Sequence, residues 1–211
     1  MKQKIHTVSF DVDGTLVTPS FVDLIWLEAL PQLVSDSWKI SLDEAKQKLF
    51  SDYNSIGSER PEWYDLNYWM KRYRLDINPK NLVLQYKSAV TIYPEVVDVL
   101  EKLKKKYNLV IISNSTRLFL DITTESLGPY FSQIISTTSD LGLMKCAEAY
   151  GTVCERCGIN CREMAHVGDS IELDYFRAKK AGIKAFYLDR RGIRRGRFFV
   201  KDLREFAMRL G

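Results

Sequence analysis

Acidic and hydroxyl side chains follow three apolar runs of the sequence, at the points where each run ends. Asp11 comes directly after Val8-Ser9-Phe10, Ser113 ends a second run and Asp169 ends a third. An apolar run that leads into a tight turn such as Gly14-Thr15 is typical of a buried strand. In an open parallel sheet, ligands bind outside the carboxyl ends of the strands. We therefore expect these side chains to meet at one sheet edge.

The residue types indicate the chemistry that such an edge could perform. Carboxylates that converge without a cation raise one another's pKa values, and a hard divalent cation such as Mg²⁺ removes the conflict. Asp13 adds a carboxylate two residues after Asp11, and Lys145 follows a turn at Gly142. A metal, the positive charge of Lys145 and the hydroxyl of Ser113 are what a phosphoryl group needs. The pattern favours phosphoryl transfer.

The order and spacing of these residues resemble the four motifs of the haloacid dehalogenase-like (HAD) hydrolase superfamily, most of whose members are magnesium-dependent phosphatases. The resemblance spans residues 8 to 188 and is with the phosphatase branch that carries a helical type 1 cap. Four agreements in order, each at the expected place in the strand pattern, are far stronger than any single motif. The motifs are Asp11-Val12-Asp13-Gly14-Thr15-Leu16, Ser113-Asn114, Lys145, and Gly168-Asp169-Ser170 with Asp174.

The resemblance and the side-chain chemistry together suggest a role for each motif residue. Asp11 would attack phosphorus and form an aspartyl-phosphate. Asp13 would be the general acid and base. The family's dehalogenase branch lacks this second Asp, so its presence indicates phosphate rather than halide chemistry. Lys145 would neutralise phosphoryl charge and orient Asp11, while Ser113 and the backbone amide of Asn114 would bind phosphate oxygens.

Mg²⁺ is the cofactor that fits both the carboxylates and the resemblance. Asp11, the backbone carbonyl of Asp13 and Asp169 would hold it. Asp174 would bind the metal directly or support another ligand, and Glu172 could compete for that place.

Two positions depart from the family pattern, since Cys146 replaces the usual Pro after the motif Lys and Leu173 replaces a frequent Asn. We expect the cysteines to be small helix residues plus one in a loop, with a local disulfide or a metal site as alternatives. His6 and His166 are interpreted as strand residues without a catalytic role. The helix is expected to carry Cys146, Cys154 and Cys157, and the loop Cys161.

The alternation of apolar strands and amphipathic helices predicts an α/β fold with a Rossmann-like parallel-sheet core and helices on both faces. Residues 17–91 break this alternation and predict an all-helical cap, so that residues 1–16 and 92–211 would form the core. The strands are expected near residues 6–11, 108–113, 133–136, 163–168 and 183–188.

Within the cap, Ser41 and Glu44 form a capping box for a helix that Gly57 would end. We expect most of the four Trp residues, all in the cap, to form its core and one or two to line a substrate pocket. The loop from Gly57 to Arg60 would face the catalytic cleft, where Arg60 could bind a second anionic group or point to solvent. The expected helices cover about 21–33, 42–56, a segment from Pro61 with Trp63, Leu66, Met70 and Tyr73, about 82–87, and a core helix from Pro94 with Val97, Leu100 and Leu103 on its apolar face.

Five Arg residues between Arg190 and Arg197 form a basic loop after the last strand. This loop is either a solvated surface or a binding site for a polyanionic substrate or nucleic acid. The sequence therefore predicts a phosphatase acting on a small phosphorylated metabolite. The alternatives are a phosphomutase on a sugar phosphate and a nucleic-acid-binding module that uses the basic loop.

The composition restricts the partners. The chain has 211 residues, 45% of them hydrophobic, which suits one domain with an insertion. A net charge of +4 fits an anionic substrate but is too small to imply nucleic acid, which we do not expect as the partner. No apolar run is long enough to span a membrane, and the polar start of the chain does not resemble a signal peptide. We expect a cytoplasmic protein; its oligomeric state stays open.

Overall fold

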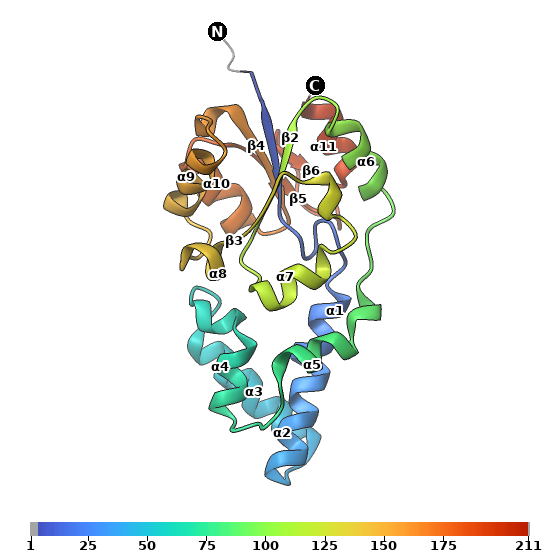
Figure 1. The fold of residues 1–211 in the computed structure, drawn as a ribbon, viewed down its shortest axis with the longest axis vertical. Helices are drawn as coiled ribbons and strands as arrows, with labels where there is room; N and C mark the ends of the chain where they lie inside the picture. The colour runs from blue at the N-terminus through green and yellow to red at the C-terminus, as the bar shows by residue number, and fades with distance from the viewer. Residues whose placement is uncertain (1–3, 211) are drawn as a thin grey trace.

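The computed structural model describes residues 4–210, which form an α/β core with a helical insertion after the first strand (Figure 1). All strand pairs are parallel, in the order β3-β2-β1-β4-β5-β6. The predicted α/β class is confirmed, and the two-residue β6 is too short to give a pattern. The strands are β1 (Thr7–Phe10), β2 (Asn108–Ser113), β3 (Gln133–Ser136), β4 (Met164–Gly168), β5 (Lys184–Leu188) and β6 (Phe199–Val200).

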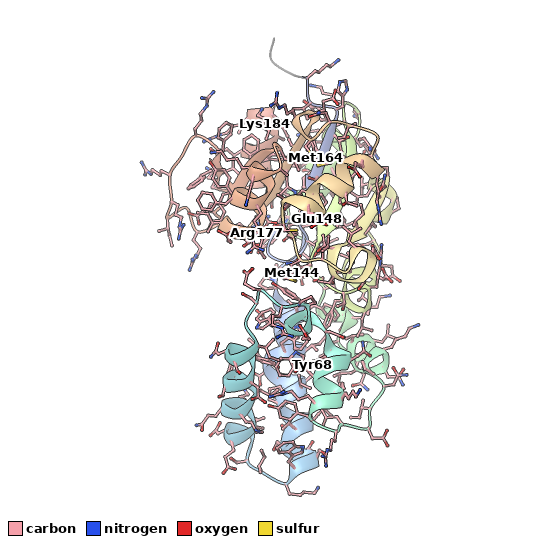
Figure 2. All side chains as sticks on the ribbon, turned by 90° about the vertical axis from the view of Figure 1, so that its left-hand side faces the viewer. Tyr68, Met144, Glu148, Met164, Arg177 and Lys184 are labelled. Atoms are coloured by element: carbon pink, nitrogen blue, oxygen red, sulfur yellow. The ribbon has the colours of Figure 1, made fainter. Side chains whose placement is uncertain are left out.

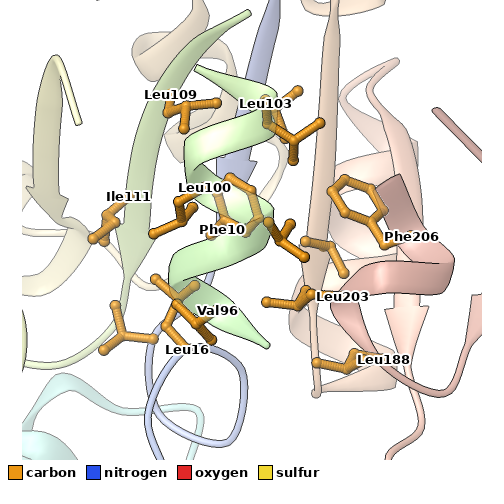
Figure 3. Close-up of a cluster of buried hydrophobic side chains, with 14 of the residues drawn as sticks. Phe10, Leu16, Val96, Leu100, Leu103, Leu109, Ile111, Leu188, Leu203 and Phe206 are labelled. Atoms are coloured by element: carbon orange, nitrogen blue, oxygen red, sulfur yellow. The ribbon is translucent and has the colours of Figure 1, made fainter. Parts of the chain in front are cut away.

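Alternate residues of the central strands pack on opposite faces of the sheet, as the period of an extended chain requires. On one face, Phe10 and Ile111 pack against α6 (Val96–Leu103) and α11 (Leu203–Leu210), as Figure 3 shows. On the other face, Ile112 packs with α9 (Ala147–Arg156) and α10 (Arg177–Lys180). Both faces are therefore covered by helices.

Two details of the core helices differ from the sequence prediction. Pro94 precedes α6, whose buried face contains Val96 and Val99 beside Leu100 and Leu103, while Val97 is 43% exposed. The prediction for Val97 was wrong because the buried stripe of the helix runs along Val96, Val99, Leu100 and Leu103, and Val97 lies outside it. Cys146 caps the start of α9 and Cys157 its end, so only Cys154 lies within that helix. All four cysteines are free.

The insertion between β1 and β2 is entirely helical and lies at the carboxyl end of the sheet (Figure 1). Its first helix runs to Trp38 rather than to about residue 33, with a π-helical stretch at Leu24–Ala29 that precedes Pro31. The segment predicted as one helix from Pro61 is divided at Asp65, which caps α4. Ser41 and Glu44 form the predicted capping box, and Gly57 ends that helix. The elements are α1 (Ser20–Asp23), α2 (Leu30–Trp38), α3 (Leu42–Ile56), the 3-10 turn Pro61–Tyr64, α4 (Leu66–Arg72), α5 (Pro79–Gln85) and the 3-10 turn Lys87–Ala89.

The cap has a hydrophobic cluster of its own, centred on the buried Trp69. Its contact with the core passes through Phe119 of α7 (Arg117–Thr123), which belongs to the same cluster. The two segments that connect the cap to the core run side by side, with a β-bridge between Val17 and Ile92. None of the helices within residues 4–210 combines the length and the apolar character needed to cross a membrane.

Candidate active site

Asp11 lies just beyond the end of β1, where it is buried and its backbone N–H continues the ladder to Val167. The chain then turns at Gly14, whose φ of 77° is in the left-handed region that suits glycine. A Cβ at this position would stand 2.1 Å from Oδ2 of Asp169. Glycine is therefore required both for the turn and for the close approach of Asp169.

Lys145 joins two carboxylates at the base of the site. Its buried ammonium donates to Asp11 over 2.5 Å and to Asp174 over 2.6 Å. Burial works against the charged form, but the two carboxylates prevail and raise the pKa of Lys145. The backbone fixes its position, because the N–H of Lys145 donates to Oδ1 of Asn114 and its carbonyl accepts from Arg177. Lys145 is thus a permanent cation beside Asp11.

Asp174 is held from three sides. Besides Lys145, it accepts from the backbone N–H of Ser170 and lies 3.2 Å from Nε2 of His166. Burial would raise the pKa of Asp174, yet Lys145 and His166 hold it well below its usual range. Glu172, by contrast, is exposed and pairs with Arg177. Asp174 is therefore the acidic residue of this segment that reaches the site.

His166 belongs to this network, a placement that the sequence interpretation missed. Its ring is buried in β4 between Oγ of Ser9 at 2.8 Å and the hydroxyl of Tyr150 at 3.1 Å. Burial lowers the pKa of His166. The neutral ring can hold Asp174 in place through Nε2, so a residue interpreted as an ordinary strand position supports the acidic cluster.

Three carboxylates could hold a cation. Oxygens of Asp11, Asp169 and Asp174 lie within 4.8 Å of one another, the only such group of acidic, His or Cys ligands within residues 4–210. Desolvation and then the charges of Asp11 and Asp174 raise the pKa of Asp169 to about 8. Burial raises the pKa of Asp11 to about 6 despite Lys145. The cluster has more negative charge than one ammonium can neutralise, and its oxygen ligands fit Mg²⁺.

The side chain of Asp13 is not part of this cluster. Its Oδ2 accepts from Oγ of Ser115 over 2.6 Å, while its buried Oδ1 has no hydrogen-bond partner among the described residues. Burial raises the pKa of Asp13. A carboxyl group with one fixed oxygen and one free oxygen can exchange a proton with a bound molecule. Ser115 directly follows the motif Ser113-Asn114, and its hydrogen bond to Asp13 was not predicted from the sequence.

Ser113 and Asn114 end β2 beside the acidic cluster and are both buried. Oγ of Ser113 accepts from the N–H of Ser115, and Oδ1 of Asn114 accepts from Thr137 and Lys145. The Asn114 side chain therefore positions Lys145, in addition to the backbone role predicted for this residue.

The cap loop between α3 and α4 meets the core, but not through Arg60. Arg60 is 64% exposed in its side chain and pairs with its neighbour Glu62, so the structure does not bring it to the carboxylates and supports its solvent-facing alternative. Glu59 instead pairs with Arg177 of the core over 2.5 Å. Figure 2 shows Arg177 on the core side of the boundary with the cap. Tyr64 lies close enough to Asn114 and Lys145 for both to oppose the rise of its pKa on burial.

A cavity of about 410 Å³, here termed the cap cavity, lies between the cap and the catalytic loops. Two of the four Trp residues line it, whereas Trp69 is in the cap cluster and Trp38 packs on Tyr73. The cavity thus joins the general acid–base candidate to an aromatic wall. Its lining comprises Asp13 and Ser115 from the core, the aromatic residues Trp26, Phe50, Tyr53, Trp63 and Tyr64, and Val22, Asp23, Leu27 and Asn54.

The basic loop has one residue that is part of the catalytic scaffold. The guanidinium of Arg190 donates to the carbonyls of Gly14 and Thr15, pairs with Glu95 at 2.8 Å and stacks 3.4 Å from the ring centroid of Tyr93. It therefore ties the loop after Asp13 to the return segment from the cap. The other four arginines, at positions 191, 194, 195 and 197, are exposed.

Comparison with known proteins agrees with this geometry. The model of the haloacid dehalogenase-like hydrolase family matches residues 5–182. A HAD phosphatase from Thermococcus onnurineus superposes with a TM-score of 0.88 at 27% identity, over 98% of each chain. This chain belongs to the haloacid dehalogenase-like hydrolase family, with the helical cap inserted between β1 and β2.

Two curated relatives are phosphatases in the broad sense. The chain is 22% identical to the GMP/IMP nucleotidase YrfG of Escherichia coli, over 80% of this chain and 76% of the relative. It is 24% identical to a glyceraldehyde 3-phosphate phosphatase of Methanocaldococcus jannaschii, over 85% of this chain and 82% of the relative. The chain is thus a HAD-like hydrolase with phosphatases among its relatives.

Proposed function

We propose that this protein is a magnesium-dependent phosphatase that hydrolyses a small phosphorylated metabolite through an aspartyl-phosphate. The observation that carries the proposal is the placement of Asp11 and Asp13. Asp11 is held by Lys145 at the sheet edge, and Asp13, whose Oδ1 has no hydrogen-bond partner among the described residues, lines the cap cavity. The candidate nucleophile and the candidate acid–base thus lie two residues apart on one loop, with the acid–base at the boundary with the cap cavity.

In the first step, a carboxylate oxygen of Asp11 forms a bond to phosphorus as the bond to the leaving oxygen breaks. Protonated Asp13 gives its proton to that oxygen, so the organic part departs as a neutral alcohol. The raised pKa of Asp13 favours the protonated form that this step needs. Lys145 holds Asp11 in position and offers its positive charge to the phosphoryl oxygens.

In the second step, Asp13 is a carboxylate and accepts a proton from water, whose oxygen attacks the phosphorus of the aspartyl-phosphate. The bond between Asp11 and phosphorus breaks, inorganic phosphate leaves, and both side chains return to their first state. The Oγ of Ser115, bonded to Asp13, keeps the carboxyl group aligned in both steps.

Asp11, Asp169 and the backbone carbonyl of Asp13 would hold Mg²⁺, and Asp174 would serve as a further ligand or position the others. When bound, the ion neutralises the carboxylates and withdraws charge from the phosphoryl oxygens. The raised pKa values of Asp11 and Asp169 support this, because their causes, burial first and then neighbouring carboxylates, are effects that a bound cation would offset.

The direct test is release of inorganic phosphate from p-nitrophenyl phosphate by purified protein with Mg²⁺, with EDTA, and after Asp11→Asn. We expect release that requires Mg²⁺ and falls at least about 10⁴-fold in the variant, because a carboxamide is a poor nucleophile. Circular dichroism of the variant controls for folding. Full activity of Asp11→Asn would refute the mechanism, and an isomeric sugar phosphate without free phosphate would indicate a phosphomutase.

A further inference from the structure

The cap cavity lies on the side of the site from which the leaving group would depart. Asp13 and Ser115 form its boundary with the core, and Asp13 is the residue that would protonate the leaving oxygen. A phosphate ester with its phosphorus beside Asp11 therefore places its organic part in this cavity. The composition of the wall then selects that organic part.

Aromatic side chains supply five of the eleven residues of the wall. Trp26 is fixed by Phe119, on which it stacks with the ring centroids 5.5 Å apart and an interplanar angle of 22°. Trp63 contacts Tyr64 by its edge at 4.9 Å, its only ring contact within residues 4–210. An indole face without a stacked protein ring can accept a planar ligand ring.

The charged lining of the cavity is entirely acidic. Among the described residues that line it, the charged ones are Asp13 and Asp23, and neither Lys nor Arg is present. Asp13 and Asp23 line the same cavity, so both negative charges act on a ligand bound there. A second phosphate or a carboxylate on the ligand would be repelled here, whereas N–H groups of a neutral ring could donate to Asp23 or Asn54.

We propose that the cap cavity selects phosphate monoesters whose organic part is uncharged and aromatic, of the size and kind of a nucleoside, and disfavours esters with a second anionic group. The proposal names the substrate class of the phosphatase and so rests on the function proposed above. The volume of about 410 Å³ lies in the range of sites that enclose ligands of this size.

The same selection argues against phosphomutase activity. A mutase that keeps the phosphoryl group on Asp11 between turnovers would transfer it to a free hydroxyl of an incoming sugar phosphate, which creates a bisphosphate within the site. That species needs a cation for its second phosphate, and the cap cavity offers carboxylates there instead. Water, which is uncharged, is then the acceptor of the phosphoryl group that the cavity does not repel.

Matched substrates test the proposal. Adenosine 5′-monophosphate and ribose 5-phosphate differ by the base alone, and adenosine 3′,5′-bisphosphate adds a second phosphate. We expect kcat/KM for phosphate release to be about 10- to 100-fold higher with the monophosphate than with ribose 5-phosphate, since one base stacked on an aromatic ring contributes about that factor. The bisphosphate should react at least about 10-fold less efficiently than the monophosphate.

Variants locate the effect. Trp63→Ala should reduce the ratio of kcat/KM for adenosine 5′-monophosphate to that for ribose 5-phosphate about 10-fold. Trp38→Ala, at an exposed cap position outside the cavity, should leave this ratio unchanged. Asp23→Asn should bring kcat/KM for the bisphosphate closer to that for the monophosphate, because one of the two repelling carboxylates is lost. Calorimetry with Asp11→Asn measures binding of the same three ligands without turnover and should give the same order of affinity.

Equal kcat/KM for adenosine 5′-monophosphate and ribose 5-phosphate would overturn the inference and leave the phosphatase function intact. Absence of phosphate release from every ester, p-nitrophenyl phosphate included, would overturn the proposed function instead. In that event the calorimetric order still decides whether the cavity selects a neutral aromatic group, because that order does not depend on catalysis.

Discussion

The core wall and the cap wall of the active site are built on different principles. On the core side, charged groups are fixed by one another, with Lys145 bonded to both Asp11 and Asp174 and each partner buried. On the cap side, rings such as Trp26 and Trp63 line an open cavity, and the cap loop beside the site contacts the core through an ion pair of Glu59, which is exposed, with Arg177.

The difference follows from what each wall has to do. Charges that act on a transition state must not reorganise during the reaction, so they need buried and fully bonded positions. A surface that selects a leaving group needs shape and polarity, which rings provide with few moving parts. We therefore expect changes in the core wall to alter kcat for every substrate, and changes in the cap wall to alter the choice among substrates.

The largest effect should come from Lys145→Met. Loss of the ammonium leaves Asp11 and Asp174 without their common cation, and kcat should fall about 10³-fold for all substrates alike. Lys180→Met, at an exposed position on α10, is the matched control and should retain activity. Steady-state kinetics on two unlike esters measure this. A loss of kcat for only one ester would contradict the expectation that the core wall acts on every substrate alike.

Trp69→Ala tests the cap as a packed unit. Trp69 is fully buried and packs against Tyr53 and Tyr73, so its truncation should lower the free energy of unfolding by about 3–5 kcal/mol. Phe206→Ala, equally buried in the core cluster, should cost a similar amount. Denaturant unfolding measures both. At temperatures where both variants are folded, only Trp69→Ala should raise KM. An equal rise of KM in Phe206→Ala would contradict the idea that the cap, and not the core, determines substrate binding.

Arg190→Ala should lower kcat about 10- to 100-fold, because the hydrogen bonds of a charged donor to two carbonyls of the catalytic loop are lost. Arg190→Lys keeps the charge but not the planar fork, and should recover only part of the rate. Arg195→Ala in the exposed part of the same loop should change kcat little. If Arg195→Ala and Arg190→Ala behave alike, the basic loop acts through its charge and not through position.

The smallest effect is expected for Glu59→Gln. The Glu59 side chain, which pairs with Arg177, is 61% exposed. Exposed ion pairs contribute less than about 1 kcal/mol to stability. KM should change less than about fivefold, and the change should vanish in high salt because the pair is screened. Kinetics at two ionic strengths measure it. A large loss of kcat would mean that this contact holds the cap in its catalytic position.

Elements with a strong local signal were predictable. The capping box of Ser41 and Glu44 and the stop at Gly57 are local hydrogen-bond and backbone requirements, and the structure contains both. Local rules failed where a helix was interrupted. The segment from Pro61 divides at Asp65, because this side chain caps α4 and the preceding turn is 3-10. Arg60 was a plausible ligand by its type, but it pairs with Glu62.

The sequence by itself determined the strand ends, the Gly14 turn and the motif residues that follow the strands, because the preferences responsible act over a few neighbouring residues. Only the tertiary structure decided which remote residues complete the site. His166 bonds Ser9 across 157 positions and Arg190 bonds Gly14 across 176, and no local pattern records such pairs. The cap cavity is likewise a product of packing, since its wall unites helices of the insertion with Ser115 from the core.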